Sequence, residues 1–275
     1  MTNPAIQKVS AVAITRFERV TREEPLVVEQ PLEIRLLYDV DGTATQKTIS
    51  ITMRTPGNDA ALAAGFLFTE GILREASQMK MITPGADGPD TTLVILQKNI
   101  EPVLFNADRN FYTSSSCGVC GKASIEAIKT VSVFAKEDDD ITIEKDIVFS
   151  LPETVEGRQA IFDSTGGLHA CALFDLSGDC IDVMEDVGRH NALDKLIGNF
   201  FIEKRLPLSR HILFLSGRAS FELVQKAYMA GIRMIAAVGA PSSLAVELAE
   251  SNGITLIGFL RGSRFNVYSG YRRIR

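Results

Sequence analysis

The chain has 275 residues, of which 45% are hydrophobic, and a formal net charge of −5 at pH 7. This length suits one large domain or two small ones, and the apolar content is enough for a real core, so the composition excludes a disordered chain. The acidic balance argues against general nucleic-acid binding, and no apolar run approaches the ~20 residues that a membrane span needs. Residues 1–20 lack the regions of a signal peptide, so we expect a cytoplasmic protein.

Residues 1–112 are expected to form a small α+β domain that resembles a β-roll. The strands of this domain are predicted from apolar runs at residues 9–20, 26–40, 46–53, 91–97 and 103–111. Asp41-Gly42 is a strong turn signal between two of these strands. A helix is expected within residues 56–71, because Pro56 and Gly57 break the preceding strand and Gly71 ends the apolar face.

The next segment, FYTSSSCGVCGKASIEAI at residues 111–128, contains a CxxC loop formed by Cys117 and Cys120. Two glycines permit tight turns there, and a helix start follows. No acidic residue lies between Arg109 and Ile125. A thiolate in this loop would gain from nearby positive charge and from helix N-terminal amides, so we predict a reactive cysteine.

Residues 113–275 are expected to form an α/β domain that carries the CxxC loop. The spacing of Ser150 and Glu153 predicts a helix from Leu151 to about Phe162. His169 opens a predicted strand, which a Ser-Gly turn joins to a second strand. Strands and helices then alternate, which indicates a mostly parallel sheet. Its predicted strands cover residues 211–215, 233–238 and 254–260.

Two polar segments of this domain are candidates for ligand binding. Ser216, Gly217, Arg218 and Ser220 precede a helix, whose free amides can hold an anion, and Arg218 adds a bidentate donor. Such loops gather at the carboxyl ends of parallel strands, where ligands commonly bind. The segment EDVGRHN at residues 185–191 is also dense in polar groups. It can bind a polar ligand, position a neighbouring catalytic loop or form internal salt bridges.

The C-terminal segment is basic. From Ser251 onward the chain has no Asp or Glu but has five arginines. Arg261 and Arg264 lie three positions apart around a Gly-Ser pair, an arrangement suited to gripping phosphate oxygens. A local anionic ligand and a solvated basic tail are the two interpretations.

Three blocks of the sequence resemble the FdhD family of sulfur carrier proteins, which serve formate dehydrogenases. They are MRTPGNDAALAAGFLFTEGI, SSSCGVCGKASIEAI and GFLRGSRFNVYSG. The resemblance implies a sulfurtransferase-type carrier in which Cys117 accepts sulfur as a persulfide from a cysteine desulfurase. The sulfur would pass to the molybdenum bis(molybdopterin guanine dinucleotide) cofactor, needed for formate dehydrogenase activity. A cytidine deaminase-like, three-layer α/β/α fold is implied for the second domain.

The same resemblance implies which residues bind this cofactor. The cofactor is a bound substrate here, and guanosine diphosphate (GDP) would mimic its nucleotide end. The cofactor-binding stretch corresponds to Phe259, Leu260, Arg261, Gly262, Ser263 and Arg264. Further lining is expected from His169, Arg189, His190, Ser216, Gly217 and Arg218. Cys120 either relays the sulfur or attacks the persulfide, releasing sulfide and closing a disulfide. We expect a homodimer, because the apolar content leaves room for an interface.

Other functions of the CxxC stay open. Zinc deaminases need an HxE motif, and here Cys171 stands where the glutamate should follow His169, so we expect no catalytic zinc. A structural zinc could join both CxxC thiols to two of four further ligands, or the CxxC could be a redox pair. Those four further ligands are His169, Cys171, Cys180 and His190. A non-catalytic chaperone that inserts the finished cofactor is the alternative function.

Overall fold

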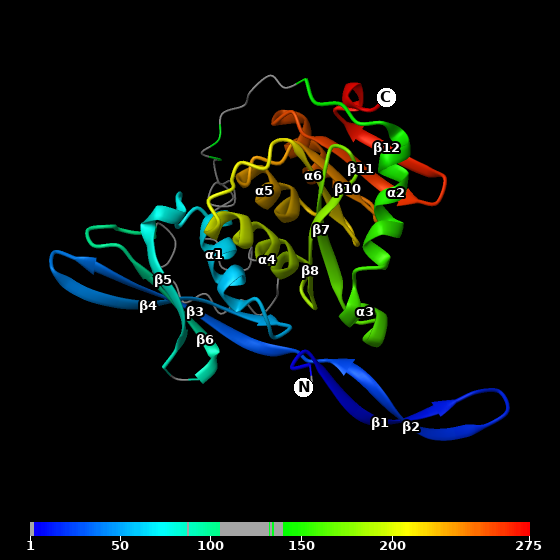
Figure 1. Cartoon of the computed structure of the whole chain (residues 1–275), viewed down its shortest axis with the longest axis horizontal. Helices are drawn as coiled ribbons and strands as arrows, with labels where there is room; N and C mark the ends of the chain where they lie inside the picture. Colours follow the sequence, from blue (N-terminus) through cyan, green and yellow to red (C-terminus); the bar gives the residue numbers. More distant parts are fainter. Residues whose placement is uncertain (1–2, 87, 105–131, 133, 135–139) are drawn as a thin grey trace.

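The computed structural model describes residues 3–86, 88–104, 132, 134 and 140–275 (Figure 1). Within these residues the chain forms three sheets, of two, four and six strands. The two-stranded sheet is the hairpin of β1 (Ile6–Ile14) and β2 (Arg19–Val27), which projects away from the rest of the molecule (Figure 1).

The four-stranded sheet has the order β4-β3-β6-β5. Its strands are β3 (Gln30–Val40), β4 (Thr43–Arg54), β5 (Met79–Gly85) and β6 (Gly88–Leu96). Asp41 and Gly42 join β3 to β4 with φ of 52° and 78°, the left-handed pair that a tight hairpin turn requires, so the predicted turn is confirmed. The short edge strand β5 was not predicted, because it lacks a regular apolar alternation and ends in Pro-Gly. Of the predicted strand at residues 103–111, residues 103 and 104 are not in a strand and the rest lie outside the described residues.

The helix predicted within residues 56–71 is α1 (Asp59–Thr69), which lies between β4 and β5 along the chain and packs against α4 (Arg189–Ile202). The two helices approach closely at a pair of glycines. A Cβ on Gly65 would lie 1.9 Å from the carbonyl oxygen of Asp194, and one on Gly198 would lie 1.9 Å from that of Ala61. This contact holds the four-stranded sheet and its helix against the rest of the molecule.

The six-stranded sheet has the order β12-β11-β10-β9-β7-β8. Its strands are β7 (His169–Asp175), β8 (Cys180–Asp186), β9 (His211–Leu215), β10 (Met234–Ala237), β11 (Thr255–Arg261) and β12 (Arg264–Ser269). β9, β10 and β11 are parallel, as predicted. At one side of these three strands, β12 pairs antiparallel with β11. At the other side, β7 pairs antiparallel with β9 and with β8.

Helices cover both faces of this sheet, which gives a mixed α/β fold in three layers (Figure 1). α4 lies on one face with α5 (Phe221–Met229) and α6 (Ser243–Ser251). On the other face lies α2 (Lys145–Glu156). The finer assignment to the cytidine deaminase-like fold stays a prediction.

The helix predicted from Leu151 to Phe162 is wrong in its bounds. α2 begins six residues earlier at Lys145, and a separate short helix, α3 (Ala160–Thr165), follows it. Ser150 lies inside α2, where its hydroxyl donates to the carbonyl of Ile147 (2.9 Å) instead of capping. The buried positions Val148, Leu151 and Val155 share one face of α2, and packing that face on the sheet overrides the local capping pattern.

Buried ion pairs connect the elements of the two larger sheets. Lys226 on α5 is 2.8 Å from Asp194 on α4 and 2.9 Å from the hydroxyl of Thr69 on α1. Lys195 on α4 is 2.7 Å from Asp186 and donates to the carbonyl of Thr55. The predicted domain boundary at residue 112 lies outside the described residues, so this division stays a prediction.

Among the described residues, no helix is long and apolar enough to cross a membrane.

Candidate functional site

The polar segments singled out from the sequence meet at one edge of the six-stranded sheet. The parallel strands β9, β10 and β11 place their carboxyl ends there. β7 runs antiparallel to β9, so its first residue, His169, lies at the same edge. Asp186, at the end of β8, lies directly opposite His169 in the strand register, and α4 begins three residues later at Arg189. We call this region the strand-end edge.

The loops that follow β9 and β10 form one backbone unit at the strand-end edge. The amide of Gly239 donates to the carbonyl of Gly217 (2.9 Å), and the amide of Ala219 donates to that of Ala240 (3.2 Å). A Cβ on Gly239 would lie 3.0 Å from backbone atoms of Arg218, so only glycine allows the loops to approach this closely. The anion-binding loop that the sequence indicated at Ser216, Gly217 and Arg218 is therefore joined to the loop that follows β10.

The first of these loops also contacts β7. The hydroxyl oxygen of Ser216 accepts from the amide of Ala170 (2.8 Å), which fixes the loop beside the start of the strand. Gly217 then lies against the imidazole, since a Cβ there would be 3.4 Å from Nδ1 of His169. Ser216 therefore has a structural bond, and Gly217 packs beside the imidazole of His169.

Positive charge converges on His169. Burial lowers the pKa of His169, and the guanidiniums of Arg189 and Arg218 lower it further, while Asp186 opposes them. The Nε of Arg189 is buried without a hydrogen-bond partner among the described residues. Because a buried guanidinium nitrogen is costly to leave unpaired, this arrangement favours an anionic ligand at the strand-end edge.

His190 lies deeper than Arg189 and is 4% exposed. Its Nε2 is 3.3 Å from the hydroxyl of Ser220 and 4.0 Å from a carboxylate oxygen of Glu222. Ser220 makes no side-chain capping bond to α5, whereas Ser242 caps α6 by accepting from the amide of Ala245. From the sequence, Ser220 was singled out with Ser216, Gly217 and Arg218 as a candidate for phosphate binding, and in the structure its hydroxyl lies beside His190.

The other polar residues of the segment 185–191 have structural partners. Glu185 accepts from the first amides of α3, including that of Phe162 (2.8 Å). Asp186 pairs with Lys195, and the side-chain amide of Asn191 donates to the carbonyl of Met53 (2.7 Å). Of the three interpretations given to this segment, an internal network describes these residues, while Arg189 contributes charge at the strand-end edge.

The C-terminal arginines lie at the tip of the β11–β12 hairpin. Arg261 and Arg264 are directly opposite each other, both are exposed, and Gly262 between them has φ of 51°. Neither arginine forms an ion pair within the part of the chain that the structure describes. Like charges directly opposite in a hairpin repel, so an anion bound between them would relieve the repulsion.

Phe259 and Leu260 lead into this tip. Phe259 has φ of 53°, which is rare for a bulky residue, and its amide donates to the carbonyl of Gly239 (3.1 Å). This bond ties the arginine hairpin to the joined loops at the strand-end edge. Leu260 is 1% exposed and packs in the core on the α2 side, so its side chain supports the site from beneath.

The cysteines divide into two groups. Cys117 and Cys120 lie outside the described residues. Cys171 is buried on the α4 face of the sheet, and burial raises the pKa of its thiol far above the ordinary range. Cys180 packs on the opposite face, and burial raises its pKa as well. Because their side chains lie on opposite faces, Cys171 and Cys180 do not complete one zinc site. Within the described ranges, no group of three or more His, Cys, Asp or Glu is arranged to hold a metal.

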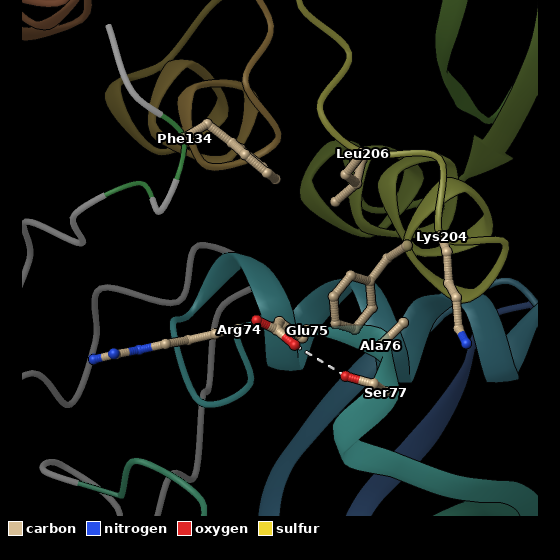
Figure 2. Close-up of a pocket in the computed structure, with 8 residues that line it drawn as sticks. Arg74, Glu75, Ala76, Ser77, Phe134, Lys204 and Leu206 are labelled. Carbon is tan, nitrogen blue, oxygen red and sulfur yellow. Dashed lines mark hydrogen bonds between the residues drawn. The ribbon is translucent and has the colours of Figure 1, made fainter.

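A cavity of about 240 Å³ lies near the other end of α4, away from the strand-end edge (Figure 2). Its lining includes Phe201 and Lys204 from the end of α4 and beyond, with Phe134 and Leu206. Figure 2 shows Arg74 directed away from the cavity and the carboxylate of Glu75 bonded to a neighbouring serine. None of the predicted site residues that the structure describes lines this cavity.

The sequence profile of the FdhD/NarQ family matches residues 27–275. This chain belongs to the FdhD/NarQ family. The sulfur carrier protein FdhD of Streptomyces avermitilis is 51% identical over 262 residues, which cover 92% of this chain and 90% of that protein. The sulfur carrier protein FdhD of Sulfolobus acidocaldarius is 40% identical, and the match covers 98% of both chains.

A solved structure has a similar fold. The crystal structure of a candidate formate dehydrogenase accessory protein from Desulfotalea psychrophila matches with a TM-score of 0.75 and 24% identity, covering 99% of this chain and all of that one. The FdhD/NarQ profile includes the CxxC loop and the whole strand-end edge, whereas most of the β1–β2 hairpin precedes its first matched residue.

Proposed function

We propose that this member of the FdhD/NarQ family is a sulfur carrier that serves formate dehydrogenase. The observation that carries the proposal is the similarity to proteins named sulfur carrier protein FdhD, which are 40–51% identical over at least 91% of this chain. The CGVC motif supplies the thiols that such a carrier needs.

In the first step, the thiolate of Cys117 attacks the terminal sulfur of a persulfide on a cysteine desulfurase. A new sulfur–sulfur bond forms on Cys117, the bond in the donor breaks, and the desulfurase cysteine leaves as a thiolate. No net oxidation or reduction occurs. The absence of acidic residues from Arg109 to Ile125 supports this step, because a thiolate is favoured where negative charge is scarce.

In the second step, the outer sulfur of the Cys117 persulfide passes to the molybdenum of the bis(molybdopterin guanine dinucleotide) cofactor, which the protein binds as a substrate. The sulfur–sulfur bond breaks, and the sulfur takes up two electrons, either from the Cys120 thiolate, which closes a disulfide with Cys117, or from a reduced molybdenum centre, with Cys117 leaving as a thiolate. The opposed guanidiniums of Arg261 and Arg264 hold phosphate oxygens at the nucleotide end. His169, Arg189 and Arg218 line the same edge, and the buried Nε of Arg189 supports this assignment. Cys120 has two roles consistent with the chemistry, and both stay proposals. It relays the sulfur, or its thiolate attacks the Cys117 persulfide, which leaves a disulfide and releases hydrosulfide.

Two finer structural assignments belong to the same proposal. The sheet with helices on both faces supports a cytidine deaminase-like fold for residues 113–275. A homodimer is the proposed assembly.

The proposal predicts a covalent sulfur on one cysteine. Incubation with a cysteine desulfurase and cysteine should add ~32 Da to the intact protein, and a thiol reductant should remove it, because a persulfide is a reversible modification. Cys117→Ala should abolish the mass gain. Cys180→Ala is the matched control and should retain it, since burial raises the pKa of the Cys180 thiol.

The same variants distinguish the alternative function. A mass gain that persists in Cys117→Ala would show that Cys117 is not the acceptor. No gain in the wild-type protein, combined with GDP binding, would favour a chaperone that inserts the finished cofactor without chemistry. In cells that depend on this protein, Cys117→Ala should leave formate dehydrogenase inactive.

A further inference from the structure

The cavity near the end of α4 takes no part in the sulfur transfer proposed above, and its volume limits what it can hold. At about 240 Å³ it is larger than the roughly 150 Å³ cavity that accepts benzene, and smaller than the roughly 300 Å³ or more of sites for drug-sized ligands. One aromatic side chain therefore fits, whereas a guanine nucleotide is too large. We call this space the α4-end cavity.

The walls of the α4-end cavity are mainly apolar. Phe134 and Leu206 are directed into the same space as Ala76, which precedes β5 (Figure 2). Phe201 is 3% exposed, and its ring stacks on that of Phe68 with 4.7 Å between the centroids, so the core holds this wall in place. Fixed aromatic and aliphatic walls favour an apolar guest, and aromatic side chains are frequent anchors in such pockets of protein interfaces.

Lys204 borders this cavity in a backbone conformation that glycine adopts more easily. α4 ends in a Schellman motif, in which the amide of Arg205 donates to the carbonyl of Phe200 (2.8 Å) and that of Lys204 to the carbonyl of Phe201 (3.0 Å). Lys204 has φ of 58°, and it occupies the left-handed position of this motif that is usually glycine. Because a lysine there is less stable than a glycine, the strain points to a role for its side chain.

Positive charge predominates at the opening of the cavity. Lys204 and Arg74 are exposed, and neither forms an ion pair with another described residue. The carboxylate of Glu75 accepts from the hydroxyl of Ser77 (3.0 Å). Arg74 points away from the cavity, so its charge lies beside the opening (Figure 2). The two cations therefore suit carboxylates that flank an apolar group on a polypeptide.

We propose that the α4-end cavity binds a partner protein through one aromatic side chain that is flanked by Asp or Glu residues. The aromatic ring fills the apolar interior, and the flanking carboxylates meet Lys204 and Arg74 at the opening. The cavity lies at the opposite end of α4 from the strand-end edge, so a partner held there leaves that edge free for its ligand. Such docking needs no sulfur chemistry, and its test involves none.

The chain has no tryptophan, so the fluorescence of a tryptophan-containing peptide reports the burial of that peptide alone. The probe is the acetylated and amidated peptide Asp-Asp-Trp-Asp-Asp, titrated with the full chain at constant ionic strength. Its emission should move to shorter wavelength and saturate, because the indole leaves water. The charge-reversed peptide Lys-Lys-Trp-Lys-Lys is the control and should bind at least about tenfold more weakly. No saturable shift, or equal affinities for the two peptides, would overturn the proposal.

Two further measurements locate the bound peptide. Ala76→Phe fills the cavity from its own wall and should remove the emission shift, since the space for the indole is lost. Saturating GDP should leave the shift of the wild-type protein unchanged, because the strand-end edge lies at the other end of α4. A shift that persists in Ala76→Phe, or that GDP abolishes, would place the peptide elsewhere and contradict the proposal.

Lys204 permits a test that separates binding from stability. Lys204→Gly should raise the peptide Kd about threefold or more, because one cation at an exposed site is lost. Its melting temperature should stay the same or rise, because glycine suits the left-handed position. Lys204→Arg keeps the charge and should bind within about twofold of the wild-type protein. Lys145→Ala, on the exposed side of α2, is the distant control and should not change the Kd. An unchanged Kd in Lys204→Gly would exclude the proposed contact.

Discussion

At the scale of single residues, His169 reports on the charge at the strand-end edge. Burial and the guanidiniums of Arg189 and Arg218 hold the pKa of His169 below its usual value of 6.5. We therefore expect neutral imidazole at pH 7 in the free protein. Arg218→Gln should raise the pKa of His169, because it removes one repelling charge. Titration of the imidazole carbon protons by NMR measures this shift. His211, whose charged neighbours are Arg205 and Asp175, is the internal control and should titrate unchanged.

The lowered pKa of His169 also makes the free energy of unfolding depend on pH. Between the folded and unfolded pKa values of His169, the unfolded chain binds more protons than the folded protein. The free energy of unfolding should therefore fall as the pH is lowered below about 6.5, and the contribution of His169 is absent above that pH. A bound anion should raise the pKa of His169. An imidazole pKa that neither Arg218→Gln nor GDP changes would show that the positive charges do not converge on it.

Arg264 tests the proposed phosphate grip. Arg264→Ala should weaken GDP binding about five- to tenfold, since one charge-assisted hydrogen bond at an exposed site contributes about 1 to 1.5 kcal/mol. Calorimetry at constant ionic strength measures the Kd. Arg205→Ala is the control, because Arg205 is also exposed but is paired with Glu203 at the opposite end of α4. An unchanged Kd in Arg264→Ala would exclude this residue from the nucleotide contact.

At the scale of elements, the contact of α1 with α4 depends on two glycines. Gly198→Ala would place a methyl group 1.9 Å from the carbonyl oxygen of Ala61 if nothing moved, so the helices must separate. We expect the free energy of unfolding in urea to fall by roughly 3 kcal/mol, as for a strongly overpacked core. Gly157→Ala, at the end of α2, has no atom within 4 Å of the added Cβ and should change the stability by less than about 0.5 kcal/mol. Equal stabilities for the two variants would contradict the close helix contact.

At the scale of the whole molecule, an acidic protein concentrates positive charge at one place. The net charge is −5, yet Arg189, Arg218, Arg261 and Arg264 all belong to the strand-end edge or to the hairpin tied to it. Salt should therefore weaken ligand binding there, because exposed charges are screened within about 8 to 10 Å at ordinary ionic strength. The core is continuous from the four-stranded sheet through α1 and α4 to the six-stranded sheet, so one hydrophobic core supports this edge.

Much of this architecture was accessible from local patterns. The turn at Asp41-Gly42, the helix ending before Gly71 and the strand at residues 211–215 agree with the structure, because turn chemistry and buried apolar runs are local properties. The edge strand β5 and the bounds of α2 were missed, since packing on a sheet set them.

The candidate site divides in the same way. The CxxC motif, the arginine pair around Gly-Ser and the helix-starting loops are local spacings, so the residues themselves indicate thiol chemistry and anion binding. Strand order and helix packing decide the rest of the site. They bring His169, Arg189 and Arg218 to one edge and let Gly239 join two loops. They also bury the polar residues Asp186 and Asn191, which support the site from within. These contacts join residues far apart along the chain, and their free energy exists only once the sheet has brought them together.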